Sequence, residues 1–91
     1  MAFTDSEIQE AHGAAMQPEA CPTDLYKLGL IYSTGQTGEV DLVRAHMWFN
    51  LAAMRGSEAA KECRRELADQ MTQNQIADAQ RAAREWLSRR H

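Results

Sequence analysis

The sequence predicts an all-α protein of about five helices, arranged as one small domain over residues 1–91. Apolar residues recur at the three- and four-residue spacing that places them on one face of a helix. No segment shows the apolar–polar alternation of a half-buried β-strand. Residues that begin helices and glycines that end them separate the segments, so the helices are expected to be short and joined by short turns.

An N-terminal helix is predicted over residues 4–16. Thr4 and Glu7 have the spacing of a capping box, in which each side chain binds the backbone N–H of the other residue. The apolar face of this helix is expected to carry Ile8, Ala11, His12, Ala15 and Met16. Pro18 and Pro22 then bracket a linker.

The second helix begins at Pro22 or Thr23, and Leu25, Leu28 and Tyr32 share one of its faces. Gly29 lies on the same face. A glycine inside a helix costs about 1 kcal/mol relative to alanine, so we expect the backbone of another helix to approach closely there. Gly35 and Gly38 suit the end of this helix, because glycine adopts the left-handed conformation that helix ends require.

Asp41 is suited to cap a third helix through its side-chain oxygen, and Gly56 is suited to end it. The broad apolar face of this helix carries Leu42, Ala45, Trp48, Phe49 and Ala52. Aromatic residues at helical spacing usually belong to a core, so Trp48 and Phe49 are expected to pack inside rather than to form a ligand cage.

Two more helices are predicted over residues 57–91. Ser57 is suited to cap the first of them, and Thr72 with Gln75 has the spacing of a second capping box. The apolar stripes of these helices consist of Ala60, Cys63, Leu67 and Met71, and then of Ile76, Ala79, Ala83, Trp86 and Leu87. Their polar outer faces are those of helices that close an array.

The segment over residues 24–56 resembles one unit of the SEL-one-like repeat, a relative of the tetratricopeptide repeat. The matching positions are Leu28, Gly29, Tyr32, Gly35, Val40, Asp41, Ala45, Trp48, Ala52, Ala53 and Gly56. The turn from Gly35 to Val40 is one residue longer than is usual in the family, which puts the geometry of that turn in question. The resemblance implies a short α-solenoid of antiparallel helix pairs, with residues 4–16 and 57–91 as caps. It also implies an adaptor or scaffolding role of the kind known from bacterial and eukaryotic signalling, without shared catalytic residues.

Composition favours a cytoplasmic protein with a protein partner. The net charge is −3, and no run of some 18 apolar residues or secretory signal is present. Residues 1–41 carry a net charge of −6 and residues 42–91 one of +3. Acidic residues interleave with the C-terminal arginines, which argues against a nucleic-acid surface. The asymmetry fits an acidic patch on another protein or a second subunit docked head to tail.

Catalytic and metal-binding patterns are missing from the sequence, so no enzyme activity, cofactor or metal is predicted. His12, His46 and His91 are scattered, and His46 is expected to be a half-exposed helix histidine. Cys21 is expected in a loop and Cys63 in a buried stripe, with a disulfide between them disfavoured in a reducing compartment.

Two regions are candidate partner-binding sites. In solenoids the first helix of each unit lines the concave surface, which here selects Tyr26, Lys27, Leu30 and Thr34. The alternative is that the N-terminal helix covers Leu30. The second region is the C-terminal tail with Trp86, Leu87, Arg89, Arg90 and His91. The alternative to a binding tail is that this segment forms a capped helix with Trp86 buried.

These observations lead to a non-catalytic adaptor or regulator of the SEL-one-like repeat type that binds another protein. The alternative is a small regulatory factor whose tail docks on a larger machine, such as an ATP-dependent protease, as activator or substrate. A nucleic-acid binder is a third and less favoured class.

Overall fold

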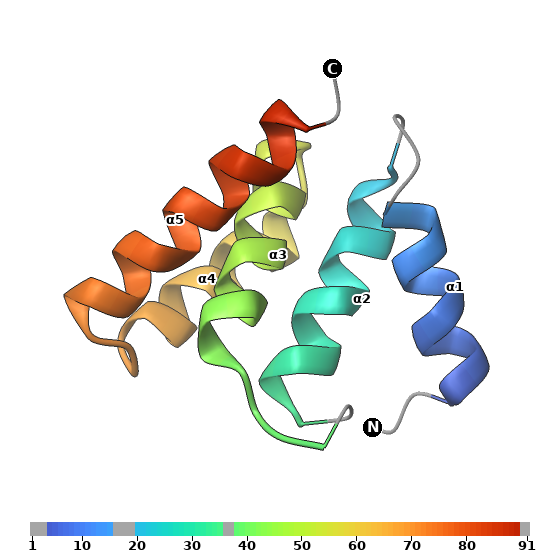
Figure 1. Ribbon diagram of the computed structural model, residues 1–91, viewed down its shortest axis with the longest axis horizontal. Helices are drawn as coiled ribbons and strands as arrows, with labels where there is room; N and C mark the ends of the chain where they lie inside the picture. Colours follow the sequence, from blue (N-terminus) through green and yellow to red (C-terminus); the bar gives the residue numbers. More distant parts are fainter. Residues whose placement is uncertain (1–3, 16–19, 36–37, 90–91) are drawn as a thin grey trace.

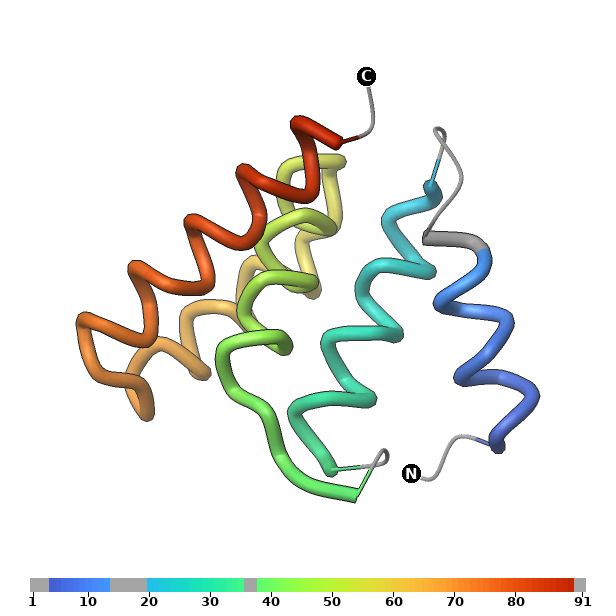
Figure 2. Tube along the Cα trace, viewed as in Figure 1, coloured from blue at the N-terminus to red at the C-terminus, as the bar shows by residue number. Residues whose placement is uncertain are grey.

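In the computed structural model, which describes residues 4–15, 20–35 and 38–89, the chain is helical and contains no strand in those ranges. The helices described there are α1 (Asp5–Ala15), α2 (Pro22–Ser33), α3 (Leu42–Met54), α4 (Glu58–Ala68) and α5 (Gln73–Ser88). Successive helices run in alternating directions (Figures 1 and 2). The predicted all-α class is confirmed. Met16 and Pro18, which the sequence places at the end of the first helix and in the linker, lie outside the described residues.

Side chains cap the starts of four helices as the sequence predicts. The Thr4 hydroxyl accepts a bond from the Glu7 backbone N–H at 3.1 Å, and the Thr72 hydroxyl accepts one from Gln75 at 3.1 Å. The reciprocal bonds of both capping boxes are also present. Asp41 and Ser57 cap α3 and α4 in the same manner. By contrast, α2 begins at Pro22 after Cys21, without a side-chain cap.

The turn between α2 and α3 uses two glycines in the left-handed region, Gly35 at φ 76° and Gly38 at φ 117°. The backbone N–H of Asp41 then donates to the carbonyl of Tyr32 at 3.0 Å. This bond ties the start of α3 to the end of α2, so the two helices form a closed hairpin.

Close packing of α2 on α3 depends on Gly29. A Cβ atom built on Gly29 would lie 2.9 Å from Cγ of Phe49 and nearer still to two other atoms of that ring. From the sequence alone, the backbone of a second helix is expected at this point. The structure shows an aromatic ring instead, because Phe49 inserts into the space that the missing side chain leaves.

Helix α3 is the centre of the molecule, since it packs against α2, α4 and α5, while α1 packs against α2. In Figure 1, α4 lies behind α3, and α5 crosses in front of α4. The largest fully buried side chains come from α2 and α3 and are Leu25, Leu28, Ile31, Phe49 and Leu51. Trp48, with 7% of its surface exposed, also belongs to this core, as predicted.

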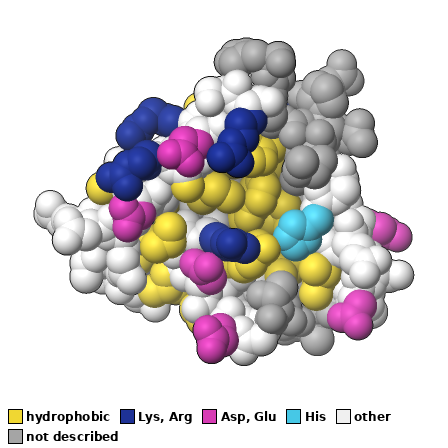
Figure 3. All heavy atoms as spheres, viewed as in Figure 1, with side chains coloured by type: hydrophobic (Ala, Val, Ile, Leu, Met, Phe, Trp, Pro, Cys, Tyr) yellow, Lys and Arg dark blue, Asp and Glu magenta, His cyan; other side chains and the backbone are white. Residues whose placement is uncertain are grey.

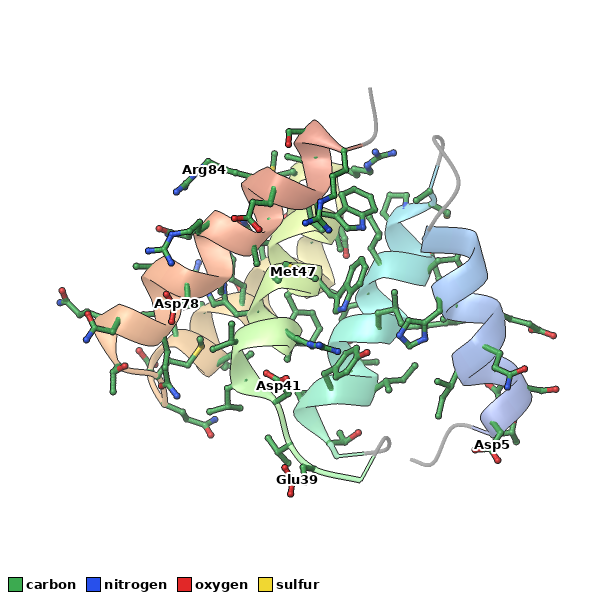
Figure 4. All side chains as sticks on the ribbon, in the orientation of Figure 1. Asp5, Glu39, Asp41, Met47, Asp78 and Arg84 are labelled. Carbon is green, nitrogen blue, oxygen red and sulfur yellow. The ribbon has the colours of Figure 1, made fainter. Side chains whose placement is uncertain are left out.

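Charged side chains cover the outer sides of the terminal helices. Asp78 and Arg84 extend from α5, and Asp5 stands at the start of α1 (Figure 4). On the face shown in Figure 3, hydrophobic side chains gather along the middle, and charged side chains of both signs surround them. No helix in the described part of the chain has the length and apolar composition needed to cross a membrane.

Candidate functional site

A groove runs between α2 and α4, with α3 beneath it. It has a volume of about 430 Å³. Its lining residues are Leu30, Ser33, Val40, Leu42, Phe49, Cys63, Glu66, Leu67 and Gln70. Helices α2 and α4 form the two walls of the groove. They are distant in the sequence and meet because both pack on α3. The floor is apolar and the rim is polar, an arrangement that suits an amphipathic segment.

Leu30 faces this groove. It is half-buried and packs against the core from α2, on the side toward α3 and α4. None of the described residues of α1 lines the groove. Helix α1 contacts another face of α2, where the His12 Nε2 atom lies 3.0 Å from the Tyr32 hydroxyl. The N-terminal helix therefore leaves Leu30 uncovered.

Tyr26 lies one helical turn before Leu30 and packs its ring on Phe49, with the ring centroids 5.8 Å apart. The Cys63 thiol of α4 donates a weak hydrogen bond to the Tyr26 hydroxyl across 3.9 Å. Burial raises the pKa of the Tyr26 hydroxyl, and the neighbouring thiol acts in the same direction. The hydroxyl therefore stays neutral at pH 7.

Lys27 and Thr34 contribute less to this groove. Lys27 is half-buried on α2, and neither residue is among the groove's lining side chains. The Thr34 hydroxyl donates to the backbone carbonyl of Leu30 at 2.7 Å. Its hydrogen bond thus satisfies the end of α2 and is not directed at an outside partner. Of the four predicted residues, only Leu30 lines the groove. Tyr26 lies beside it and contacts two lining residues, Phe49 and Cys63.

The C-terminal end of α5 is partly packed. Trp86 is half-buried, and its ring meets Trp48 of α3 edge-on at 5.8 Å between centroids. Leu87 is also half-buried against the core, whereas Arg89 is exposed and ends the helix. Arg90 and His91 lie outside the described residues. Within the described part, the apolar residues of the tail belong to a packed helix.

His46 is not the half-exposed helix histidine that the sequence suggested. Only 3% of its surface is exposed, and its Nδ1 atom has no hydrogen-bond partner among the described residues. The expectation was wrong because α4 and α5 cover the side of α3 that carries His46. Periodicity identifies the faces of a helix but not how many neighbours surround it.

Both cysteines are free, with Cys21 exposed before α2 and Cys63 half-buried in the groove. Within the described ranges, no three histidine, cysteine or acidic side chains come together in a way that would hold a metal ion. The groove itself offers one carboxylate, that of Glu66, together with amide, thiol and hydroxyl groups. The lining groups of the groove can therefore bind another molecule through apolar contact and hydrogen bonds.

Sequence reasoning missed the α4 wall of the groove. Cys63 and Leu67 were assigned to a buried stripe, and Glu66 and Gln70 were not singled out. Residue spacing offers no signal for this wall, because it forms only where α4 packs beside α2 and α3.

Comparison with known proteins adds no further assignment, since no protein family, curated protein or solved structure matches the chain.

Proposed function

We propose that this chain is a non-catalytic protein-binding module, an adaptor or regulator of the SEL-one-like repeat type, and that the groove between α2 and α4 holds its partner. The observation that carries the proposal is the groove itself. Leu30 and Leu42 are only partly buried and leave apolar surface in a hollow that no described residue of α1 lines.

The arrangement of the helices supports the repeat assignment. In stacked helical pairs, the first helices of neighbouring units lie side by side and line the binding surface. Here α2 and α3 form an antiparallel pair, and α4, the next helix along the chain, contacts α2 as well as α3. Helix α5 packs against α3, and its polar outer side suits the end of an array.

The chemistry of the groove indicates the type of segment that it binds. Leu30, Leu42 and Leu67 offer an apolar floor, while Glu66 and Gln70 are exposed at the rim. Glu66 forms no ion pair among the described residues, so its charge is available to a partner. The expected ligand is an amphipathic segment of another protein with apolar anchors and a basic residue placed near Glu66.

Affinity capture from the native cell, followed by mass spectrometry, tests the proposal. Glu66→Lys reverses an exposed charge in the groove and should abolish recovery of the partner without altering the circular dichroism spectrum. Glu10→Lys makes the same reversal on exposed α1 and should leave recovery unchanged. Equal recovery of the partner by the wild type, Glu66→Lys and Glu10→Lys would contradict a binding site in the groove.

A variant that lacks residues 88–91 separates the groove from the tail. Under the proposal this variant keeps its partner. Loss of the partner on deletion, with Glu66→Lys still binding, would instead support docking of the tail on a larger machine. Affinity for DNA or RNA that falls steeply with salt would support the nucleic-acid class.

A further inference from the structure

A second hollow lies on the opposite side of α4, where α3, α4 and α5 converge. It has a volume of about 380 Å³ and is independent of the groove between α2 and α4. Its polar lining residues are His46, Asn50, Lys61, Arg64, Arg65 and Gln80. We call this hollow the basic cleft, because its titratable lining residues are one histidine and three cationic side chains.

The three cations of the basic cleft differ in how they are paired. Lys61 forms an ion pair with Glu58 at 3.0 Å, and Arg65 forms one with Glu62 at 3.5 Å. These pairs are exposed, and exposed pairs contribute about 0–1 kcal/mol, so the two cations can turn toward a ligand at little cost.

Arg64 has a neutral partner instead. Its Nη1 atom donates to Oδ1 of Asn50 at 2.8 Å, and no carboxylate of the described residues pairs with it. Gln80, the polar residue that α5 adds to the lining, is also neutral. One half-buried guanidinium therefore keeps an uncompensated positive charge, with donors left over for a second hydrogen-bonding group.

His46 at the base of the cleft is the second, independent observation. It is the buried polar side chain of α3 whose Nδ1 atom has no partner in the described structure. A buried polar atom left unpaired costs about 1–3 kcal/mol, and such atoms are rare in folded proteins. Burial lowers the pKa of His46, and the charge of Arg64 lowers it further, so the ring is neutral at pH 7 and carries one N–H donor.

We propose that the basic cleft binds an oxyanion, either a carboxylate or a phosphate group, with Arg64 as its principal ligand and Lys61 and His46 beside it. The planar guanidinium offers two parallel N–H donors, which match two oxygens of such a group. Lys61 supplies a mobile positive charge from one helical turn away. The anion compensates the charge of Arg64, which neutral Asn50 does not.

Titration of the full chain with inorganic phosphate, followed by NMR, tests this proposal. Ionic strength is held constant with sodium chloride. The expected result is a saturable shift of the side-chain signals of Arg64 and His46. A parallel titration with acetate distinguishes a carboxylate source from a phosphate source. Absence of a saturable shift with both anions would overturn the proposal.

Two variants and a control identify the ligands. Arg64→Gln should weaken anion binding at least tenfold, and Lys61→Gln, which sits at the rim, should weaken it about threefold to tenfold, or up to about 1.4 kcal/mol at that conversion. Arg81→Gln removes an arginine paired with Asp78 on the exposed side of α5 and should leave binding unchanged. Equal weakening by all three variants, or by none, would contradict a specific site.

Discussion

Gly29 is the residue whose size matters most to the core. The Phe49 ring occupies the place where any larger residue would put its Cβ atom. Gly29→Ala should therefore lower the free energy of unfolding by about 1–3 kcal/mol, the usual cost of overpacking a well-filled core. Urea denaturation followed by circular dichroism measures the change.

Gly13 provides the matched control. It is an exposed glycine of α1, and a Cβ atom placed on it would meet nothing within 4 Å. Gly13→Ala should raise the free energy of unfolding by about 0.5–1 kcal/mol, because alanine is the better helix former. Destabilisation of the same size in both variants would mean that Gly29 owes its importance to the helix backbone and not to Phe49.

His46 should make stability depend on pH. Its pKa in the folded protein lies below the ordinary value of 6.5, because of burial first and Arg64 second. The unfolded chain therefore takes up a proton at higher pH than the folded protein does. The contribution of His46 to the free energy of unfolding is fully present above pH 6.5, and it is lost as the pH falls below that value.

Urea denaturation at pH 7.5 and pH 5.5, for the wild type and for His46→Gln, checks this expectation. The wild type should lose more stability than the variant between the two values, by up to about 1.4 kcal/mol. Every other ionisable group is present in both proteins, so the comparison isolates His46. An equal loss in the two proteins would show that His46 titrates alike in the folded and unfolded states.

At the scale of the helix, the capping box of α5 should make a measurable contribution. Thr72→Ala removes the hydroxyl that accepts the Gln75 N–H bond, and should cost about 1 kcal/mol in unfolding free energy. Thr23→Ala is the control, since Thr23 is exposed in the first turn of α2 and caps no helix of the described structure. A cost that is the same at both positions would indicate a general effect of threonine and not the cap.

The helices themselves could be predicted because their signals are local. Thr4, Asp41, Ser57 and Thr72 each mark a helix start through a hydrogen bond within four residues. The partner of Gly29 was harder to identify. A glycine on an apolar face indicates close approach, but only the fold shows that the approaching group is a side chain from Phe49.

At the scale of the whole molecule, the sites depend on contacts between distant segments. Tyr26 and Leu30 could be selected from α2 alone, but their neighbours Cys63 and Leu67 become visible only when α4 packs beside α2. The basic cleft was missed for the same reason. The contact of Arg64 with Asn50 of α3 cannot be read from residue spacing.

One helix thus separates two surfaces of different character. Helix α4 presents Cys63, Glu66, Leu67 and Gln70 to the groove, and Lys61, Arg64 and Arg65 to the basic cleft. A partner in the groove and an anion in the cleft would contact opposite sides of the same helix. We propose that the groove between α2 and α4 is the protein-binding site.

Site-specific photo-crosslinking in the native cell tests that claim most directly. A photoreactive residue is placed at Gln70 in the groove, at Gln9 on α1, or at Ser88 near the end of α5, all of which are exposed positions. We expect a crosslinked protein partner from Gln70 and none from Gln9 or Ser88. A partner crosslinked from Ser88 or Gln9 but not from Gln70 would contradict it.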